Sequence, residues 1–318
     1  MEASNGLDAK ARHPRFDVPY RSAASILAHP DFPLARATYI RDVLALYGHD
    51  PAINKLLVVA ARMVLFFVVI CLDANYRVED RSTWPTVGRL KAALATFGLA
   101  SSRRIDQIVG RLIQTGFIES APSPVDGRVR LLRPTARTLE HDQDWLIAHY
   151  RPLACLFGEA DYRLPLNRDV VFQQTQRRVA TGFLEESAHV LMRNPGIMLF
   201  FSREAGILVV MELVQASLLE GSATIPLSLA GLGERRGVSR THVRQLLADA
   251  EAHGLVDLDV ASRQITLAPT LLASLDQFIA EGMSNHDLTH ALAISQMSRS
   301  VVPGDFALAE RGASRLTF

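Results

Sequence analysis

The chain has 318 residues, a formal net charge of +1, 48% hydrophobic residues and 21% charged residues. This balance excludes an intrinsically disordered protein and argues against one that coats nucleic acid regardless of sequence, whereas a local basic surface would still suit a sequence-specific binder. The two cysteines are too few for a disulfide framework. We therefore expect both to be reduced and the protein to be cytoplasmic.

The N-terminal third combines a polar start with an unusually apolar helix. Residues 1–14 are polar and are expected to be disordered. A helical pattern covers 35–47, and a long apolar helix is predicted from the Asp-Pro pair at residue 50 onward. Its most apolar part, 56–72, barely reaches membrane-spanning length and contains Arg62. We interpret it as a helix buried between two halves of the molecule, with no membrane contact.

A set of short elements follows this apolar helix. In chain order the pattern predicts a strand at 81–85, helices at 86–97 and 101–115, strands at 117–121 and 128–133, and a closing helix at 135–150. Ser101 suits the N-cap of its helix, and Gly116 suits the stop. The Asp126-Gly127 pair is a turn signal between the two strands.

A second set of the same kind lies near the C-terminus. An irregular linker at 151–166 and a long amphipathic helix at 168–192 separate the two sets. The second set is predicted as a helix at 197–220, a strand at 223–226, helices at 227–236 and 239–253, strands at 255–260 and 264–267, and a helix at 270–280. From about residue 298 no period is clear, and we expect a loose tail.

The two sets are an internal repeat. The stretch at 99–118 reads LASSRRIDQIVGRLIQTGFI, and it aligns without a gap with GVSRTHVRQLLADAEAHGLV at 237–256. Ser101 matches Ser239, and Gly116 matches Gly254. The match extends beyond these helices, because the Pro-Thr pair that ends at Thr135 has a counterpart that ends at Thr270. A single repeat of this length indicates a duplicated domain and not a solenoid.

These stretches resemble the winged helix-turn-helix transcription regulators of bacteria, most nearly the MarR-like group. The resemblance implies a mainly α (α+β) fold in which long helices join two winged helix-turn-helix domains about a pseudo-twofold axis. The implied organisation is a disordered N-terminus at 1–14, a first winged-helix domain with N-terminal helices at 15–150, a linker and long helix at 151–193, a second winged-helix domain at 194–297 and a tail at 298–318.

The resemblance also implies a function. Members of the group usually bind palindromic operators as homodimers, so double-stranded DNA is the expected partner and transcription regulation the expected role. Two such domains in one chain predict either a monomeric pseudo-dimer on an imperfect palindrome or a homodimer. Such regulators often take a small-molecule effector between the dimer helices and the winged unit, although no residue of the sequence identifies a pocket.

The candidate DNA-binding residues lie opposite the apolar faces of the two recognition helices and on the two hairpins. Arginine suits guanine and glutamine suits adenine in the major groove, whereas arginines on the hairpins suit phosphates or the minor groove. The candidates are Ser102, Arg103, Arg104, Gln107, Arg111, Gln114, Arg128, Arg130, Arg133, Arg235, Arg236, Arg240, Thr241, His242, Arg244, Gln245 and Arg263. Asp249 stands where the first helix has Arg111, so the two helices need not read the same sequence.

Two other functions remain open. A plasmid-type replication initiator also carries tandem winged helices, and a winged-helix scaffold would bind protein instead of DNA. Catalysis has little support, because the sequence contains no glycine-rich phosphate loop. His286 and His290 could share a helix face, but a third metal ligand is not evident. We therefore expect no enzyme activity, no metal and no cofactor.

Overall fold

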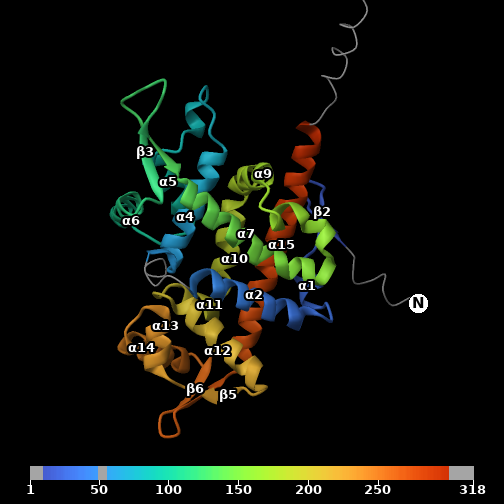
Figure 1. The fold of residues 1–318 in the computed structure, drawn as a ribbon, viewed down its shortest axis with the longest axis vertical. Coiled ribbons are helices and arrows are strands. Elements are labelled where there is room, and N and C mark those ends of the chain that lie inside the picture. Colours follow the sequence, from blue (N-terminus) through green and yellow to red (C-terminus); the bar gives the residue numbers. More distant parts are fainter. Residues whose placement is uncertain (1–9, 49–55, 301–318) are drawn as a thin grey trace, which may run out of the picture.

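The computed structural model describes residues 10–48 and 56–300, and they form a mainly helical molecule with small antiparallel sheets (Figure 1). This confirms the mainly helical class expected from the sequence. The helices of five residues or more are α1 (Ala23–Leu27), α2 (Phe32–Gly48), α4 (Ala60–Ala74), α5 (Val87–Ala95), α6 (Ser102–Gln114), α7 (Ala136–Phe157), α9 (Val170–Ala180), α10 (Leu184–Met192), α11 (Pro195–Phe201), α12 (Gly206–Glu220), α13 (Leu229–Arg236), α14 (Arg240–Ala252) and α15 (Pro269–Ser300). The strands are β1 (Ala11–Arg12), β2 (Pro19–Tyr20), β3 (Ile118–Pro122), β4 (Arg130–Pro134), β5 (Thr224–Pro226), β6 (Val256–Asp259) and β7 (Gln264–Leu267).

Helix α6 forms where the sequence predicts it, and its ends have the expected caps. The Ser101 side chain accepts a hydrogen bond from the backbone N–H of Arg104 at 3.3 Å, which satisfies one donor of the first turn. The helix buries Ile105, Ile108, Val109 and Leu112 on one face. Burying this stripe holds the helix against the core and leaves the opposite face in solvent.

Helix α14 repeats this arrangement. The Ser239 side chain accepts from the backbone N–H of His242 at 3.1 Å. The buried face consists of Val243, Leu246, Leu247 and Ala250, which are the positions predicted from the sequence.

The residues that follow α6 and α14 also have the same backbone conformation and the same hydrogen bond. Gly116 and Gly254 have φ values of 74° and 66°, a left-handed conformation that a glycine adopts without strain at the end of a helix. The Thr135 hydroxyl donates to the Gly116 carbonyl at 2.9 Å, and the Thr270 hydroxyl donates to the Gly254 carbonyl at 3.1 Å. In both places the start of the closing helix is therefore tied to the end of the helix before the hairpin.

We use "first unit" for residues 60–150 and "second unit" for residues 206–280. Each contains, in order, an apolar helix, two shorter helices, a two-stranded antiparallel hairpin and a closing helix. The hairpins are β3–β4 and β6–β7, close to the predicted strands.

The predicted strand at 81–85 is wrong. Residues Arg81–Thr83 form a 3₁₀ helix, η1, because Asp80 caps this turn by accepting from the backbone N–H and the hydroxyl of Ser82. The Pro85 carbonyl still accepts from the Leu132 N–H at 2.7 Å, which gives this segment one bond to the hairpin. The counterpart in the second unit, β5, is a strand, as predicted, and it pairs with β7.

The single helix predicted over 168–192 is also wrong. It is divided into α9 and α10 by a 3₁₀ turn, η3 (Thr181–Phe183). The Thr181 hydroxyl donates to the Cys71 carbonyl of α4 at 3.0 Å, and Phe183 is buried in a small cluster with Val179 and Leu288. The break between the two helices thus coincides with tertiary contacts to α4 and α15.

The helix predicted over 197–220 is likewise divided, into α11 and α12. Ala205 has a left-handed φ of 52°, and its N–H donates to the Val58 carbonyl at 2.9 Å. The chain turns so tightly that a Cβ on Gly206 would lie 2.2 Å from the Phe200 carbonyl oxygen. In the first unit, α4 begins only at Ala60, and the expected start at residues 50–55 lies outside the described residues.

Three other expectations are corrected. The linker predicted as irregular is largely helical, because α7 continues to Phe157 and is followed by η2 (Glu159–Tyr162) and α8 (Arg163–Leu166). Residues 10–14, expected to be disordered, include β1, which pairs with β2. Helix α15 continues to Ser300, so it includes the first residues of the expected tail. The rest of the N-terminus expected to be disordered, 1–9, and the rest of the expected tail, 301–318, lie outside the described residues.

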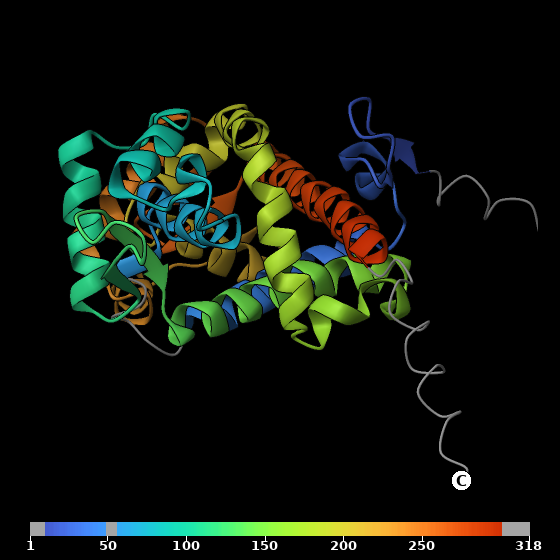
Figure 2. The ribbon, with the colours of Figure 1, turned by 90° about the horizontal axis from the view of Figure 1, so that it is seen from above.

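Helix α15 joins the second unit to the rest of the molecule (Figures 1 and 2). It begins beside β7, contacts α11 and α10, and runs along α7, α9 and α1. Asp287 on this helix accepts from the Arg21 backbone N–H at 2.6 Å and from the Tyr162 hydroxyl at 2.5 Å. Helix α2 lies against both α7 and α12. The two units therefore share one hydrophobic core.

A buried ion pair joins α7 and α9. Arg177 of α9 donates through Nε to Asp142 Oδ2 of α7 at 3.0 Å and through Nη2 to Oδ1. Gln173 donates to Oδ2 as well, at 2.8 Å. Burial opposes the charge on Arg177, but Asp142 outweighs it and raises the pKa of the guanidinium.

Two stacked histidines lie beside this ion pair. The rings of His149 and His286 are 4.8 Å apart, and His286 Nδ1 lies 2.8 Å from the Gly282 carbonyl. Burial lowers the pKa of His286 to about 4, and burial together with His286 lowers the pKa of His149 well below its usual value. Both rings are therefore neutral at pH 7.

We expect the histidines to make stability fall in mild acid. Between pH 6.5 and 4 the unfolded chain binds a proton at His286 that the folded chain does not, so the free energy of unfolding decreases as the pH falls. In His286→Asn, whose amide retains a donor for the Gly282 carbonyl, the loss between pH 7 and pH 5 should be smaller by about 2 kcal/mol. Urea denaturation at the two pH values measures it. Equal losses in both proteins would contradict the assignment.

Candidate nucleic-acid interface

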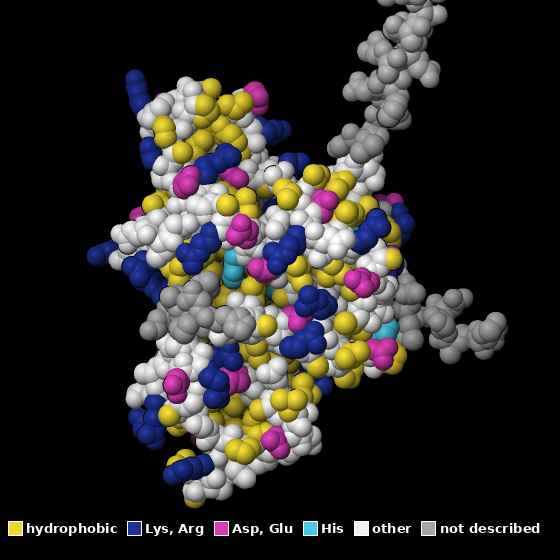
Figure 3. Space-filling view, viewed as in Figure 1, with side chains coloured by type: hydrophobic (Ala, Val, Ile, Leu, Met, Phe, Trp, Pro, Cys, Tyr) yellow, Lys and Arg dark blue, Asp and Glu magenta, His cyan; other side chains and the backbone are white. Residues whose placement is uncertain are grey.

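Helices α6 and α14 lie along the same edge of the molecule, at the left of Figures 1 and 2. The β3–β4 hairpin is at one end of this edge and the β6–β7 hairpin is at the other. Lys and Arg side chains occur at several places along this edge in Figure 3, and others are spread over the rest of the visible face. Helices α6 and α14, which carry the candidates for contacts with DNA bases, therefore lie between two hairpins that point in opposite directions.

All the candidate DNA-binding residues of α6 are exposed to solvent. They are Ser102, Arg103, Arg104, Gln107, Arg111 and Gln114. Arg104 Nη1 donates to the Gln107 side-chain oxygen at 3.3 Å, which orders two of them. Asp106 is the acidic residue of this helix, and Lys91 of α5 neutralises it at 2.7 Å. The exposed face therefore combines arginines and glutamines with little uncompensated negative charge.

The arginines of the first hairpin divide into two kinds. Arg128 and Arg130 are exposed, and Arg130 is held across the hairpin by Ser120. Arg133 instead forms an ion pair with Asp73 of α4 at 2.9 Å, with its guanidinium 5.0 Å from the centre of the Tyr76 ring. Arg133 thus attaches the hairpin to α4. This corrects the prediction that its guanidinium is free to contact DNA.

The candidate DNA-binding residues of α14 are also exposed, except for His242. Arg240, Thr241, Arg244 and Gln245 are exposed. His242 is half-buried, and its Nε2 lies 2.9 Å from the carbonyl oxygen of residue 204, so it holds α14 against the α11–α12 turn. It is therefore less available for DNA than the sequence predicted.

Asp249 is compensated by a residue that the sequence did not reveal. Arg203 Nη2 lies 2.5 Å from Asp249 Oδ2, and Gln245 donates to Oδ1 at 2.9 Å. The repulsion of phosphate expected from this carboxylate is therefore weakened. Arg203 lies 46 residues before Asp249 in the sequence, so no local pattern links the two residues.

The remaining candidates belong to α13 and the second hairpin. Arg235 and Arg236 donate to the two carboxylate oxygens of Glu212 on α12. Arg235 remains exposed, whereas Arg236 is only 7% exposed and acts inside the unit. Arg263 is exposed at the tip of the second hairpin and has a left-handed φ of 54°.

In comparisons with protein-family models, curated proteins and solved structures, no match was found. Within the described residues, none of the helices combines the length and apolar character needed to cross a membrane.

Proposed function

We propose that the protein is a sequence-specific, double-stranded-DNA-binding regulator of transcription, built from two winged helix-turn-helix domains in one chain. The observation that carries this proposal is the pair of serine-capped helices, α6 and α14, each with an exposed face of arginine and glutamine on the same edge of the molecule. Each is followed by a hairpin that carries exposed arginine.

The chemistry of these faces suits the major groove. An arginine guanidinium donates two parallel hydrogen bonds to guanine, and a glutamine amide pairs with adenine. The hairpin arginines are placed to contact phosphates beside the groove. Arg103 and Gln107 on the first helix correspond to Thr241 and Gln245 on the second. Because the faces differ, the target is an imperfect palindrome.

Two units in one chain replace the two subunits of a homodimer in this proposal. The shared core, with α2 and α15 in contact with both sides, supports a fixed spacing between the units. Such an intramolecular pseudo-dimer reads two half-sites about one helical turn of DNA apart.

The test is selection of bound sequences from a pool of random duplex DNA at two salt concentrations. An enriched imperfect palindrome, with affinity that falls steeply as the salt concentration rises, supports the proposal because specific binding combines base contacts with phosphate contacts. If no sequence is enriched and binding is weak at both salt concentrations, the proposal is wrong and the exposed faces serve a protein partner. Enrichment of iterated sites from a single origin would favour a replication initiator.

A further inference from the structure

Both acidic residues of the first hairpin lie beside an arginine. Asp126, in the turn between β3 and β4, forms an ion pair with Arg81 at 2.6 Å. Glu119 of β3 lies directly across the strands from Arg133 of β4. The negative charge of this hairpin is therefore compensated. Its two remaining arginines are exposed, and they are Arg128 and Arg130.

The second hairpin has the opposite balance of charge. Asp257 and Asp259 are two residues apart on β6, so their side chains lie on the same face of the strand, and both are exposed. The residues directly across from them on β7 are uncharged, namely Thr266 and Gln264. The arginine of this hairpin is Arg263, at its tip. The hairpin that follows α14 therefore carries more negative charge than positive charge.

The acidic residues of the second hairpin are held beside α14. Asp259 Oδ1 accepts from the backbone N–H groups of Ala261 at 3.0 Å and Ser262 at 3.1 Å. Hydrogen bonds, above all from Ser262, lower the pKa of Asp259, so this side chain is ionised at pH 7. Strand β6 is an edge strand that contacts α14, and the Leu258 N–H donates to the Glu251 side chain of α14 at 2.8 Å. The negative charges therefore lie next to the second candidate DNA-binding helix.

Helices α6 and α14 differ in charge in the same direction as their hairpins. Helix α6 has three arginines and one aspartate, Asp106, which Lys91 neutralises. Helix α14 has two arginines and two acidic residues, Asp249 and Glu251. Arg203 compensates Asp249, whereas Glu251 accepts its hydrogen bond from an uncharged backbone N–H. The first unit therefore offers DNA phosphates a more positive surface than the second unit does.

We propose, on the basis of the DNA-binding function proposed above, that the two units bind DNA with unequal strength. The first unit anchors the protein through α6 and through phosphate contacts of its hairpin. Asp257 and Asp259 keep the second hairpin away from the phosphates, so α14 reads its half-site with few phosphate contacts. Phosphate contacts supply much of the affinity for DNA and its dependence on salt. A lone half-site of the first unit is therefore also a target, whereas a lone half-site of the second unit is not.

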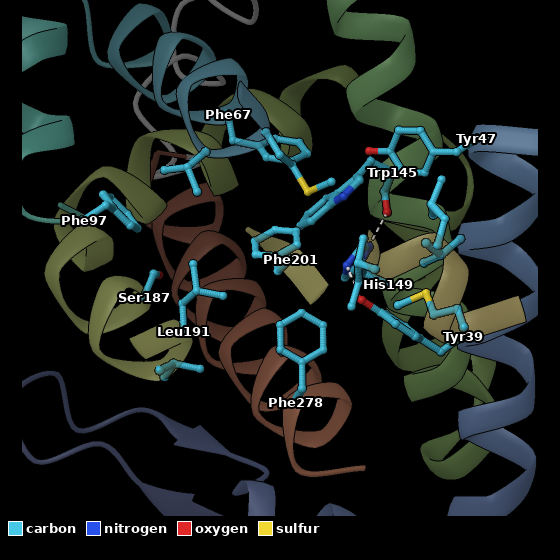
Figure 4. A pocket seen from close by; sticks show the side chains of 18 residues that line it. Tyr39, Tyr47, Phe67, Phe97, Trp145, His149, Ser187, Leu191, Phe201 and Phe278 are labelled. Carbon is cyan, nitrogen blue, oxygen red and sulfur yellow. Dashed lines mark hydrogen bonds between the residues drawn. The ribbon is translucent and has the colours of Figure 1, made fainter. Parts of the chain in front are cut away.

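The second half-site still contributes, because the two units belong to one body. At their junction, aromatic side chains line an apolar cavity of about 200 Å³, with Phe67 and Trp145 from the first unit and Phe278 from the second (Figure 4). Around this junction the units share one hydrophobic core. A first unit bound to DNA therefore holds α14 near the second half-site at a high effective concentration.

Fluorescence anisotropy with the selected duplex, and with two duplexes in which one half-site is scrambled, measures the inequality. Scrambling the half-site of the first unit should reduce affinity about tenfold more than scrambling the other half-site, and should reduce the salt dependence more. Arg103→Ala identifies the half-site of the first unit, because its effect on affinity disappears when that half-site is scrambled. Equal losses from the two half-sites overturn unequal binding and leave the regulator proposal standing. If the wild type does not prefer the selected duplex to one with both half-sites scrambled, the regulator proposal is wrong and unequal binding is wrong with it.

The double variant Asp257→Asn with Asp259→Asn tests the role of the two aspartates. Asparagine keeps an oxygen acceptor for the hairpin turn, and thermal denaturation confirms that the variant is folded. It should bind the duplex that retains only the second half-site about threefold to tenfold more tightly at low salt, and the gain should shrink as the salt concentration rises.

The matched control is Asp31→Asn with Glu159→Gln. Both residues are exposed and lie outside the two units, so the change in net charge is the same. The control should bind this duplex within about twofold of the wild type. A gain that is equal in the two double variants, or absent from the hairpin variant, overturns the role of Asp257 and Asp259.

Discussion

Replacing Asp142 by alanine is expected to lower the free energy of unfolding by about 3–5 kcal/mol, because it leaves the Arg177 guanidinium buried without a counter-ion. The side-chain amide of Gln173 loses one of its two acceptors at the same time and keeps the Leu139 carbonyl. Urea denaturation followed by circular dichroism measures the change. A loss below 1 kcal/mol would show that water or another acceptor replaces the carboxylate.

Two further variants distinguish the cost of leaving Arg177 unpaired from the cost of losing an ion pair in general. Asp106→Ala removes the partly exposed pair with Lys91 and should cost no more than about 1 kcal/mol. The double variant Asp142→Ala with Arg177→Met removes both buried charges. It should recover part of the stability lost in Asp142→Ala, since the main cost there is the unpaired charge.

Replacing Arg103 and Arg111 together by alanine is expected to reduce affinity for the selected DNA by about 100-fold or more. Both side chains are exposed on α6, and each arginine that bonds a guanine bidentately contributes about 1–3 kcal/mol. Fluorescence anisotropy with the selected duplex at physiological salt measures the affinity. Sequence preference should relax in one half-site only, which assigns that half-site to the first unit.

The matched control is Arg12→Ala with Arg163→Ala. Both residues are exposed and lie outside the two units, so the change in net charge is the same. At physiological ionic strength, salt screens the interaction between exposed charges that are more than about 8 Å apart. Two arginines outside the proposed DNA face should therefore contribute little, and this variant should bind the DNA within about threefold of the wild type. An equal loss in the control and in the α6 variant would mean that net charge, and not the α6 face, determines affinity.

The sequence predicts the elements that are governed by local rules. The serine caps, the glycine stops and the spacing of apolar residues locate α6 and α14 to within a residue, because these signals act within one or two turns of the chain. The hairpins were predicted nearly as well, since alternation and turn residues are also local.

The errors arise where distant contacts override local preference. The breaks at Thr181 and Ala205 are stabilised by hydrogen bonds to Cys71 and Val58, and no local signal announces such partners. For the same reason, the exposed arginines of the candidate site could be predicted, but the internal roles of Arg133 and Arg236 could not. Both pair with carboxylates on the apolar helices, far away in the sequence.

The two hairpins differ in length, because the turn covers 123–129 in the first and only 260–263 in the second. A symmetric dimer looks the same after it is turned end for end on a palindrome. This chain would look different after such a turn. The long hairpin would take the place of the short one, and the face of α6 would take the place of the face of α14. On the DNA proposed here, each molecule would therefore have a polarity, so its remaining surfaces would face a defined side of the site.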